Sequence, residues 1–290
     1  MATVARGWMA FRIYLEMIKF EHSLFALPFA MLGMMWGARG WPGWRVFLLI
    51  VLAMVSARSA AMAFNRIVDR DIDAQNPRTR LRALPAGLLR LSDATLFFVG
   101  SCVVFFLAAA ALNPLALALA PVALGTTLFY SLTKRFTPLC HLILGLSLGI
   151  APAAAWIGAT GRLEWAIVPI TLAVMFWTAG FDVIYSLQDE EFDREHRLRS
   201  LPETLGKARA LTLSRVFHVL AILCFLVGGS LYGAGPLYFA GVLLAAGLLA
   251  YEQSLVKPHD LSRVDVAFFT LNGFVSIGVF VFALADRLLT

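Results

Sequence analysis

Charged residues are scarce in this chain. Only 14% of its 290 residues are Asp, Glu, Lys or Arg, whereas 60% are hydrophobic, and the mean hydropathy is +0.79. Soluble domains typically carry about 25% charged residues and a smaller apolar share. This composition excludes an ordinary soluble domain and indicates a polytopic membrane protein.

Cysteine is also scarce, and neither the cysteines nor the histidines are spaced as metal ligands usually are. Cys102, Cys140 and Cys224 stand singly within or beside apolar stretches, which excludes a paired-cysteine metal site or redox couple and predicts packing roles. No partner at ligand spacing accompanies any of the five histidines, so we expect no histidine metal site. The histidines are His22, His141, His196, His218 and His259.

Two further patterns are missing. The net charge of +6 is not arranged as a basic groove interleaved with aromatic residues, which argues against nucleic-acid binding. The first apolar stretch contains charged residues and is not followed by a small-residue cleavage site. We therefore expect no cleaved signal peptide.

Long apolar stretches fill most of the chain. One crossing of a bilayer takes about 20 apolar residues, and nine stretches approach or reach that length. They lie at 20–38, 45–64, 93–112, 114–132, 139–159, 165–186, 211–231, 235–253 and 265–285. We expect an all-α integral membrane protein whose nine helices form one domain over residues 1–290.

Lys and Arg are distributed unevenly between the two ends of these spans. One side gathers Arg6, Arg12, Lys19, the loop 66–90, Lys134, Arg135, the loop 194–215, Lys257 and Arg263. The other side holds only Arg39, Arg45, Arg162 and Arg287. Because positive loops stay in the cytoplasm, we expect a cytoplasmic N-terminus, a C-terminus on the opposite side, and a bacterial inner membrane. The positive charge on the first of these sides is also suited to attract anionic lipid headgroups and a polyanionic substrate.

Two groups of acidic residues stand at the cytoplasmic ends of the second and sixth spans. Asn65, Asp69 and Asp73 are four residues apart, and Asp189 and Asp193 repeat that spacing. A step of four residues turns an α-helix by about 400°, so each partner lies close to the same face. The acids of each pair should therefore point the same way.

Asp71 differs from its neighbours in this respect. It is about 200° round the helix from Asp69 and should face elsewhere.

Hard oxygen ligands suit Mg²⁺, which proteins usually hold through a few carboxylates together with substrate phosphates. The paired carboxylates therefore predict a Mg²⁺-bridged diphosphate. The alternative for either pair alone is a solvated acidic helix end that pairs with nearby arginines.

Basic residues and a proline follow each acid pair. Arg78 and Arg82 follow the first pair, and Arg194 and Arg199 follow the second. Guanidinium groups form paired hydrogen bonds with phosphate oxygens, although each arginine taken singly also obeys the topology rule. The repeated order suggests two half-sites that face one another across a central cavity.

These motifs together resemble those of the UbiA-type intramembrane aromatic prenyltransferases. The residues concerned are Asn65-x-x-x-Asp69-x-x-x-Asp73, Arg78-Thr-Arg-Leu-Arg82-Ala-Leu-Pro85-Ala-Gly87, Tyr130-Ser-Leu-Thr-Lys134-Arg135, and Asp182-Val-Ile-Tyr185-Ser-Leu-Gln-Asp189 followed by Asp193. Two positions depart from the family pattern: Arg66 stands where many members have Asp, and Ala83 interrupts an Arg-Pro-Leu sequence. The resemblance implies a helical bundle around a cavity that opens to lipid, capped on the cytoplasmic side by the two Asp-rich loops.

The resemblance also implies roles for these residues in Mg²⁺-dependent transfer of a prenyl chain to an aromatic ring. The expected catalytic and metal-binding residues are Asp69, Asp73, Asp189 and Asp193. They would bind the metal ion and, through it, the diphosphate. Asn65 is expected to be an oxygen ligand or to orient one. Candidate substrate contacts are Arg78, Arg82, Lys134, Arg135 and Arg199.

Arg58 and Asp182 are ionisable residues inside apolar spans, where an unpaired charge is costly. We expect both to face the cavity. Arg58 would hold an acceptor carboxylate or the diphosphate, and Asp182 would orient an acceptor hydroxyl or accept a proton. The alternative is that they pair with each other or with the backbone. Tyr130 and Tyr185 either line the pocket or anchor the protein at the membrane interface.

The residue sequence of these motifs looks most like that of the quinone-pathway branch of the family. The expected substrates are a polyprenyl diphosphate and an aromatic acid, either 4-hydroxybenzoate in ubiquinone synthesis or a dihydroxynaphthoate in futalosine-type menaquinone synthesis. Other acceptors, such as haem, chlorophyll or a lipid ether, remain alternatives. A secondary transporter is a further alternative, but a carrier would place its charges near the bilayer midplane.

Overall fold

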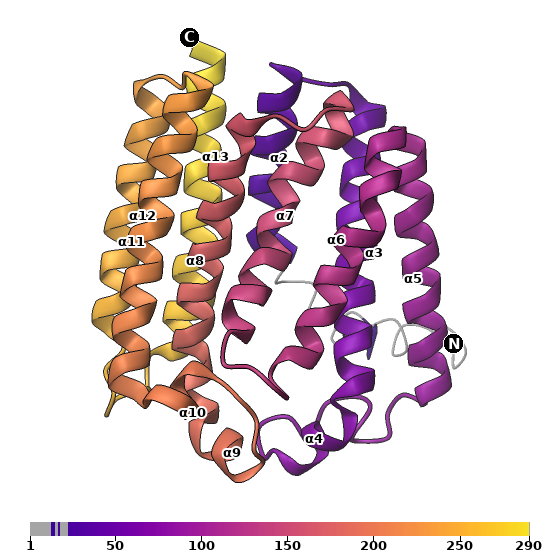
Figure 1. The fold of residues 1–290 in the computed structure, drawn as a ribbon, viewed down its shortest axis with the longest axis vertical. Coiled ribbons are helices and arrows are strands. Elements are labelled where there is room, and N and C mark those ends of the chain that lie inside the picture. The colour runs from indigo at the N-terminus through magenta and orange to yellow at the C-terminus, as the bar shows by residue number, and fades with distance from the viewer. Residues whose placement is uncertain (1–12, 15–16, 18–22, 290) are drawn as a thin grey trace, which may run out of the picture.

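The computed structural model describes residues 13–14, 17 and 23–289, and this part of the chain contains helices and no β-strand. Nine longer helices run side by side and form a bundle (Figure 1). They are α2 (Ser23–Ala38), α3 (Trp44–Val68), α5 (Leu91–Leu112), α6 (Pro114–Thr133), α7 (Cys140–Thr160), α8 (Val168–Ser186), α11 (Lys207–Tyr232), α12 (Pro236–Leu255) and α13 (Asn272–Leu289).

Short helices join the long ones, mainly at one end of the bundle. Figure 1 places α4 (Arg70–Gln75), α9 (Glu190–Glu195) and α10 (Leu201–Leu205) together at that end. Two 3₁₀ turns, η2 (Trp165–Ile167) and η3 (Leu187–Asp189), flank α8, and a π-helix, η4 (Val266–Leu271), precedes α13. Both acid motifs therefore lie at the same end of the molecule.

Eight of the expected spans are confirmed within the described residues. Eight segments there are helical, long enough and apolar enough to cross a membrane. The expected first span, 20–38, corresponds in part to α2, which has 16 residues, and its residues 20–22 lie outside the described ones. The expectations for the N-terminus, including the absence of a signal peptide, also fall on residues that are not described.

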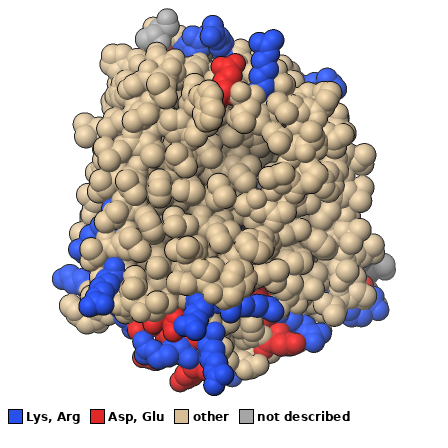
Figure 2. Space-filling view, viewed as in Figure 1, with Lys and Arg blue, Asp and Glu red and all other residues tan. Residues whose placement is uncertain are grey.

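The charged side chains gather at the ends of the bundle. Figure 2 shows a broad face with few Lys, Arg, Asp or Glu side chains between them, and most charges on this face cluster at the end that carries α4, α9 and α10. Many large apolar side chains, such as Leu96, Leu107 and Leu243, are exposed between these ends. An apolar belt between polar ends is the surface expected of a protein surrounded by lipid.

Small residues let the central helices approach closely. A Cβ atom on Gly33 would collide with the backbone of Pro152, and one on Gly145 would collide with the carbonyl oxygen of Met175. These contacts join α2 to α7 and α7 to α8, in the manner usual for helices packed within membranes. The close packing holds α8 at the centre of the bundle, where Trp177 is fully buried.

A buried polar chain ties α8 to α12 and to the π-helix. The Trp177 indole N–H donates to Asn272 Oδ1 at 2.6 Å, and Asn272 Nδ2 lies 3.3 Å from Glu252 Oε1. The same amide donates to the carbonyl oxygens of Ala267 and Phe268, each at 3.1 Å. A π-helix leaves backbone carbonyls without their usual partners, and Asn272 satisfies two of them.

We predict that Asn272→Leu destabilises the protein by about 1–3 kcal/mol, because it leaves the buried Trp177 N–H and two carbonyl oxygens without partners. The measurement is the melting temperature of the purified protein in detergent. Phe274→Leu is the control, because the side chain of Phe274 is 60% exposed on the lipid-facing side of the same helix. Equal melting temperatures for the two variants would contradict the structural role of Asn272.

Candidate active site

A cavity of about 310 Å³ lies among α3, α6, α7 and α8 at the end of the bundle that carries α4 and α9. All but one of the site residues expected from the sequence line it. They are Arg58, Asn65, Asp69, Asp73, Arg78, Arg82, Tyr130, Lys134, Arg135, Asp182, Tyr185, Asp189 and Asp193. Three stretches that are far apart in the sequence, 58–82, 130–135 and 182–193, thus meet around one space.

Arg199 is the expected residue that the structure does not bring into the cavity lining. Its side chain is exposed. Its backbone N–H donates to the carbonyl oxygen of Lys134 at 2.6 Å, which docks the second cap loop against the end of α6.

The first acid motif stays helical across the junction between α3 and α4. Asp73 N–H donates to the carbonyl oxygen of Asp69 at 2.7 Å, so one helical hydrogen bond bridges the two helices. Asn65 Nδ2 donates to Asp69 Oδ2 at 2.8 Å. Asp71 points away, as expected: its side chain is 82% exposed, it pairs with Arg70, and it does not line the cavity.

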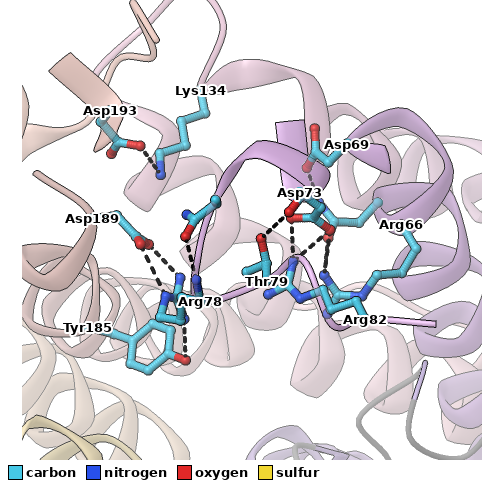
Figure 3. A network of polar contacts seen from close by, with 12 residues as sticks. Arg66, Asp69, Asp73, Arg78, Thr79, Arg82, Lys134, Tyr185, Asp189 and Asp193 are labelled. Atoms are coloured by element: carbon cyan, nitrogen blue, oxygen red, sulfur yellow. Dashed lines mark hydrogen bonds and ion pairs between the residues drawn. The ribbon is translucent and has the colours of Figure 1, made fainter. Parts of the chain in front are cut away.

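Each acid of the two motifs forms an ion pair with a basic residue that the sequence also singled out, and Figure 3 shows the pairs of Asp73, Asp189 and Asp193. The pairs are Asp69 with Arg135 at 3.1 Å, Asp73 with Arg82 at 2.7 Å, Asp189 with Arg78 at 2.5 Å and Asp193 with Lys134 at 2.7 Å. Removing one partner from a largely buried pair leaves a costly unpaired charge. The basic residues therefore hold the acid motifs at the mouth of the cavity.

Arg78 joins the two motif-bearing loops directly. It comes from the loop that follows α4, and its guanidinium group makes two hydrogen bonds to the Asp189 carboxylate, at 3.1 and 2.5 Å. It also donates to the Tyr185 hydroxyl at 2.8 Å and lies 5.1 Å from the centre of that ring. Tyr185 therefore faces the site rather than acting only as an interface anchor.

Arg66 is a site residue that the sequence analysis noted only as a departure from the family pattern. It is buried, it lies 3.7 Å from Asp73 Oδ2, and it donates to Asn65 Oδ1 at 3.2 Å. In the sequence, the feature that could have pointed to this role is that Arg66 directly follows Asn65. The local helix geometry gave no reason to expect an inward-facing arginine next to an inward-facing asparagine.

Burial and charge shift the titration of two groups at the mouth. Burial raises the pKa of Asp69, against the opposing effect of its hydrogen bond from Arg135. Burial alone would lower the pKa of Lys134, but the carboxylates of Asp193 and Asp189 outweigh it and raise that pKa. Lys134 therefore stays protonated and suited to an anionic ligand.

A second, deeper layer contains Arg58 and Asp182. Each stands seven residues before the first residue of an acid motif, Asn65 or Asp189, which is about 10 Å along a helix. Arg58 has no ion-pair partner within the described part of the chain, and its Nε is buried without a hydrogen bond. Asp182 instead pairs with His141, so an Arg58–Asp182 pair is not formed.

His141 is the other residue that sequence reasoning missed. Its Nδ1 lies 2.6 Å from Asp182 Oδ2, and it lines the cavity. The partner stands 41 residues away on another helix, beyond the reach of any spacing rule.

The donor atoms at the mouth fit Mg²⁺ in one particular mode. Within the described residues, no group of three or more His, Cys, Asp or Glu side chains is arranged to enclose a metal ion. Mg²⁺ is commonly held by one or two carboxylates and completed by substrate phosphates and water. Asp and Asn oxygens that face one cavity beside several cations suit that mode rather than an all-protein cage.

Comparison with known proteins identifies the family. The model of the UbiA prenyltransferase family matches residues 26–275. A 4-hydroxybenzoate octaprenyltransferase from Saccharophagus degradans is 30% identical over 87% of this chain and 84% of its own length. One from Methylobacillus flagellatus is 31% identical over 87% and 86%, respectively.

Solved structures agree with this assignment. An apo UbiA homolog from Aeropyrum pernix K1 superposes with a TM-score of 0.80 and 32% identity, covering 93% of this chain and 98% of that one. A UbiA homolog from Archaeoglobus fulgidus bound to GPP and Mg²⁺ shares the fold, with a TM-score of 0.74, 20% identity and coverage of 95% and 99%. The chain therefore belongs to the UbiA prenyltransferase family and is a membrane-embedded prenyltransferase.

Proposed function

We propose that this enzyme transfers a polyprenyl group from a polyprenyl diphosphate to the ring of an aromatic acid, in a Mg²⁺-dependent step of quinone synthesis. The acceptor is 4-hydroxybenzoate or a dihydroxynaphthoate. The observation that carries the proposal is the layered cavity: paired acids and bases surround its mouth, and Arg58 lies deeper without a carboxylate partner. The names of the relatives support the acceptor class.

The mouth of the cavity is the proposed diphosphate site. Asp69, Asp73, Asp189 and Asp193, with Asn65 as a ligand or orienting residue, would hold Mg²⁺ together with the diphosphate. Bound Mg²⁺ would neutralise negative charge on the leaving group. The basic partners of these acids, which include Arg78, Arg82, Lys134 and Arg135, would then be available to bind phosphate oxygens.

The reaction needs one bond to break and another to form. The bond between the allylic carbon and the diphosphate oxygen breaks, and both electrons leave with the diphosphate. The allylic carbon bonds to an electron-rich ring carbon of the acceptor, and that carbon then loses its proton and restores the aromatic ring. Water would trap the allylic cation as an alcohol, so the apolar cavity wall, which includes Phe25, Phe181 and Phe268, is functionally important.

The deeper layer is the proposed acceptor site. Arg58 would form an ion pair with the acceptor carboxylate, and the Asp182 carboxylate would accept a hydrogen bond from the acceptor hydroxyl. The two residues come from α3 and α8 and line the same cavity. This arrangement fits a flat acid with a carboxylate at one end and a hydroxyl at the other.

We predict that Arg58→Met raises the KM for the aromatic acid by about tenfold to a hundredfold, because a charge-assisted hydrogen bond is lost. The KM for the polyprenyl diphosphate should stay within about twofold of wild type. Steady-state kinetics with each substrate varied in turn make the measurement, and Arg58→Lys is the control that keeps the charge. A rise in the diphosphate KM alone would assign Arg58 to the diphosphate instead.

We also propose that α2 belongs to the ninth crossing. A helix of 16 residues spans about 24 Å, slightly less than the hydrocarbon core of a bilayer. With nine crossings, the positive-inside rule applied to the basic loops at the α4 and α9 end supports a proposed orientation in which that end and the N-terminus would face the cytoplasm of a bacterial cell and the C-terminus would lie across the inner membrane. The diphosphate would then enter from the cytoplasm or the inner leaflet.

A further inference from the structure

His141 makes two hydrogen bonds from a buried position at the start of α7. Its side chain is only 2% exposed. One ring nitrogen, Nδ1, lies 2.6 Å from Asp182 Oδ2, and the other, Nε2, lies 3.2 Å from the backbone nitrogen of Leu201. The imidazole thus bridges the deep layer of the cavity and the second cap loop.

The partner of Nε2 determines where the ring proton is. A backbone N–H can only donate, so Nε2 must accept with its lone pair. In the neutral ring the proton then resides on Nδ1, which donates to the Asp182 carboxylate. A doubly protonated ring would direct an N–H at the N–H of Leu201. The geometry therefore favours a neutral His141 that donates through Nδ1 to the Asp182 side chain and accepts through Nε2 from Leu201.

Several contacts hold the Leu201 amide in place. Leu201 is the first residue of α10, where a backbone N–H has no partner within its own helix. Two neighbouring contacts dock the preceding residues against α6 and α7: Arg199 N–H donates to the Lys134 carbonyl oxygen, and Cys140 Sγ lies 3.6 Å from the Arg199 carbonyl oxygen. The amide is therefore a fixed donor that orients the imidazole.

Asp182 differs from the four acids at the mouth in the kind of partner it has. Those acids pair with Arg or Lys, whose positive charges neutralise them. The imidazole supplies one hydrogen bond without a full positive charge, and it contacts Oδ2, so Oδ1 of Asp182 remains for a further partner. A carboxylate oxygen that faces the cavity suits a hydroxyl donor.

We propose that His141 is a positioning residue that aims Asp182 at the hydroxyl group of the aromatic acceptor. It fixes the carboxylate through Nδ1–H, and the Leu201 amide fixes the tautomer that makes this bond possible. The acceptor class is then a hydroxylated aromatic acid, whose ring becomes richer in electrons when its O–H donates to Asp182. This inference rests on the proposed function and deepens it.

The test compares two variants at this position. In His141→Gln, the side-chain amide offers an N–H to Asp182 and an oxygen to Leu201, whereas His141→Leu fills similar space and offers neither. We expect His141→Leu to lower kcat with the aromatic acid by about tenfold to a hundredfold, as is typical when an orienting partner is lost. His141→Gln should recover most of that loss, and both variants should keep the wild-type KM for polyprenyl diphosphate.

His218→Gln is the matched control. His218 is a buried histidine on α11 that lies 3.0 Å from the Gln253 side chain and does not line the cavity. The His218→Gln variant should keep the wild-type kcat. The inference is overturned if His141→Leu keeps the wild-type kcat, if His141→Gln falls as far as His141→Leu, or if the diphosphate KM rises as much as kcat falls.

A measurement without turnover separates this inference from the proposed function. ¹⁵N NMR of the histidine-labelled protein in detergent reports the tautomer, with His141→Gln used to assign the signal. We expect a neutral ring protonated on Nδ1, and a ring protonated on Nε2 would overturn the inference. If the wild-type protein prenylates no hydroxylated aromatic acid, the proposed function fails whatever the tautomer is.

Discussion

Asp189→Asn is expected to lower the rate of prenyl transfer by about a hundredfold to a thousandfold. The change keeps the size of the side chain but removes a negative charge that would hold Mg²⁺ and the diphosphate at the mouth of the cavity. Losing one group that stabilises the leaving anion commonly costs that much. The rate is measured as prenylated product formed by purified enzyme at saturating substrate concentrations.

A matched control lies two residues away. Glu191→Gln makes the same chemical change at an exposed position that does not line the cavity, and it should keep the wild-type rate. Asp69→Asn and Asp71→Asn form a second such pair on the first motif, because Asp69 lines the cavity and the Asp71 side chain is 82% exposed. Equal losses in the cavity-lining and exposed variants would contradict the metal and diphosphate roles.

Removal of divalent metal is expected to abolish transfer without unfolding the protein. EDTA should reduce product formation to background, and added Mg²⁺ should restore it. Ca²⁺ should restore less, because it is larger and prefers more ligands at longer distances. The fold should persist, because Arg78, Arg82, Lys134 and Arg135 form ion pairs with the four acids and can neutralise their charge.

The melting temperature distinguishes the two effects of metal removal. We expect it to be the same in EDTA and in Mg²⁺ when no diphosphate is present. Full activity after exhaustive chelation would show that transfer does not need a divalent ion. A large fall in melting temperature in EDTA alone would show that the metal is structural, which the ion pairs at the mouth argue against.

The ion pairs suggest how the site would accommodate a diphosphate with Mg²⁺. Each motif acid has a basic partner, and three of these pairs connect segments that are far apart in sequence: Asp69 with Arg135, Asp189 with Arg78, and Asp193 with Lys134. A diphosphate with Mg²⁺ carries both kinds of charge, so it can exchange partners with both sides of each pair. Binding would then replace internal ion pairs rather than create unpaired charge.

Much of the fold was predictable because its spans carry a strong composition signal. The eight confirmed spans begin and end within a few residues of the apolar stretches, as in α6, which was expected at 114–132 and runs from Pro114 to Thr133. The helical spacing of Asp69 and Asp73 correctly excluded Asp71 from the cavity. Local periodicity was sufficient for these features.

Features that depend on contacts between helices were not predictable. His141 was not expected in the site because it has no partner at ligand spacing, and no periodic pattern joins it to Asp182, which is 41 residues away on another helix. The π-helix before Asn272 depends on the carbonyl contacts of that buried amide, which composition does not indicate. Arg199 followed the basic pattern of its loop, but its side chain is exposed outside the cavity.

The most direct test is an assay of the purified protein in detergent with Mg²⁺, a polyprenyl diphosphate, and a panel of 4-hydroxybenzoate and dihydroxynaphthoates. Mass spectrometry identifies any prenylated ring, and released diphosphate is measured in parallel. We predict a Mg²⁺-dependent product with at least one of these hydroxylated aromatic acids. Folded protein that releases no diphosphate and prenylates none of them would contradict the proposed function.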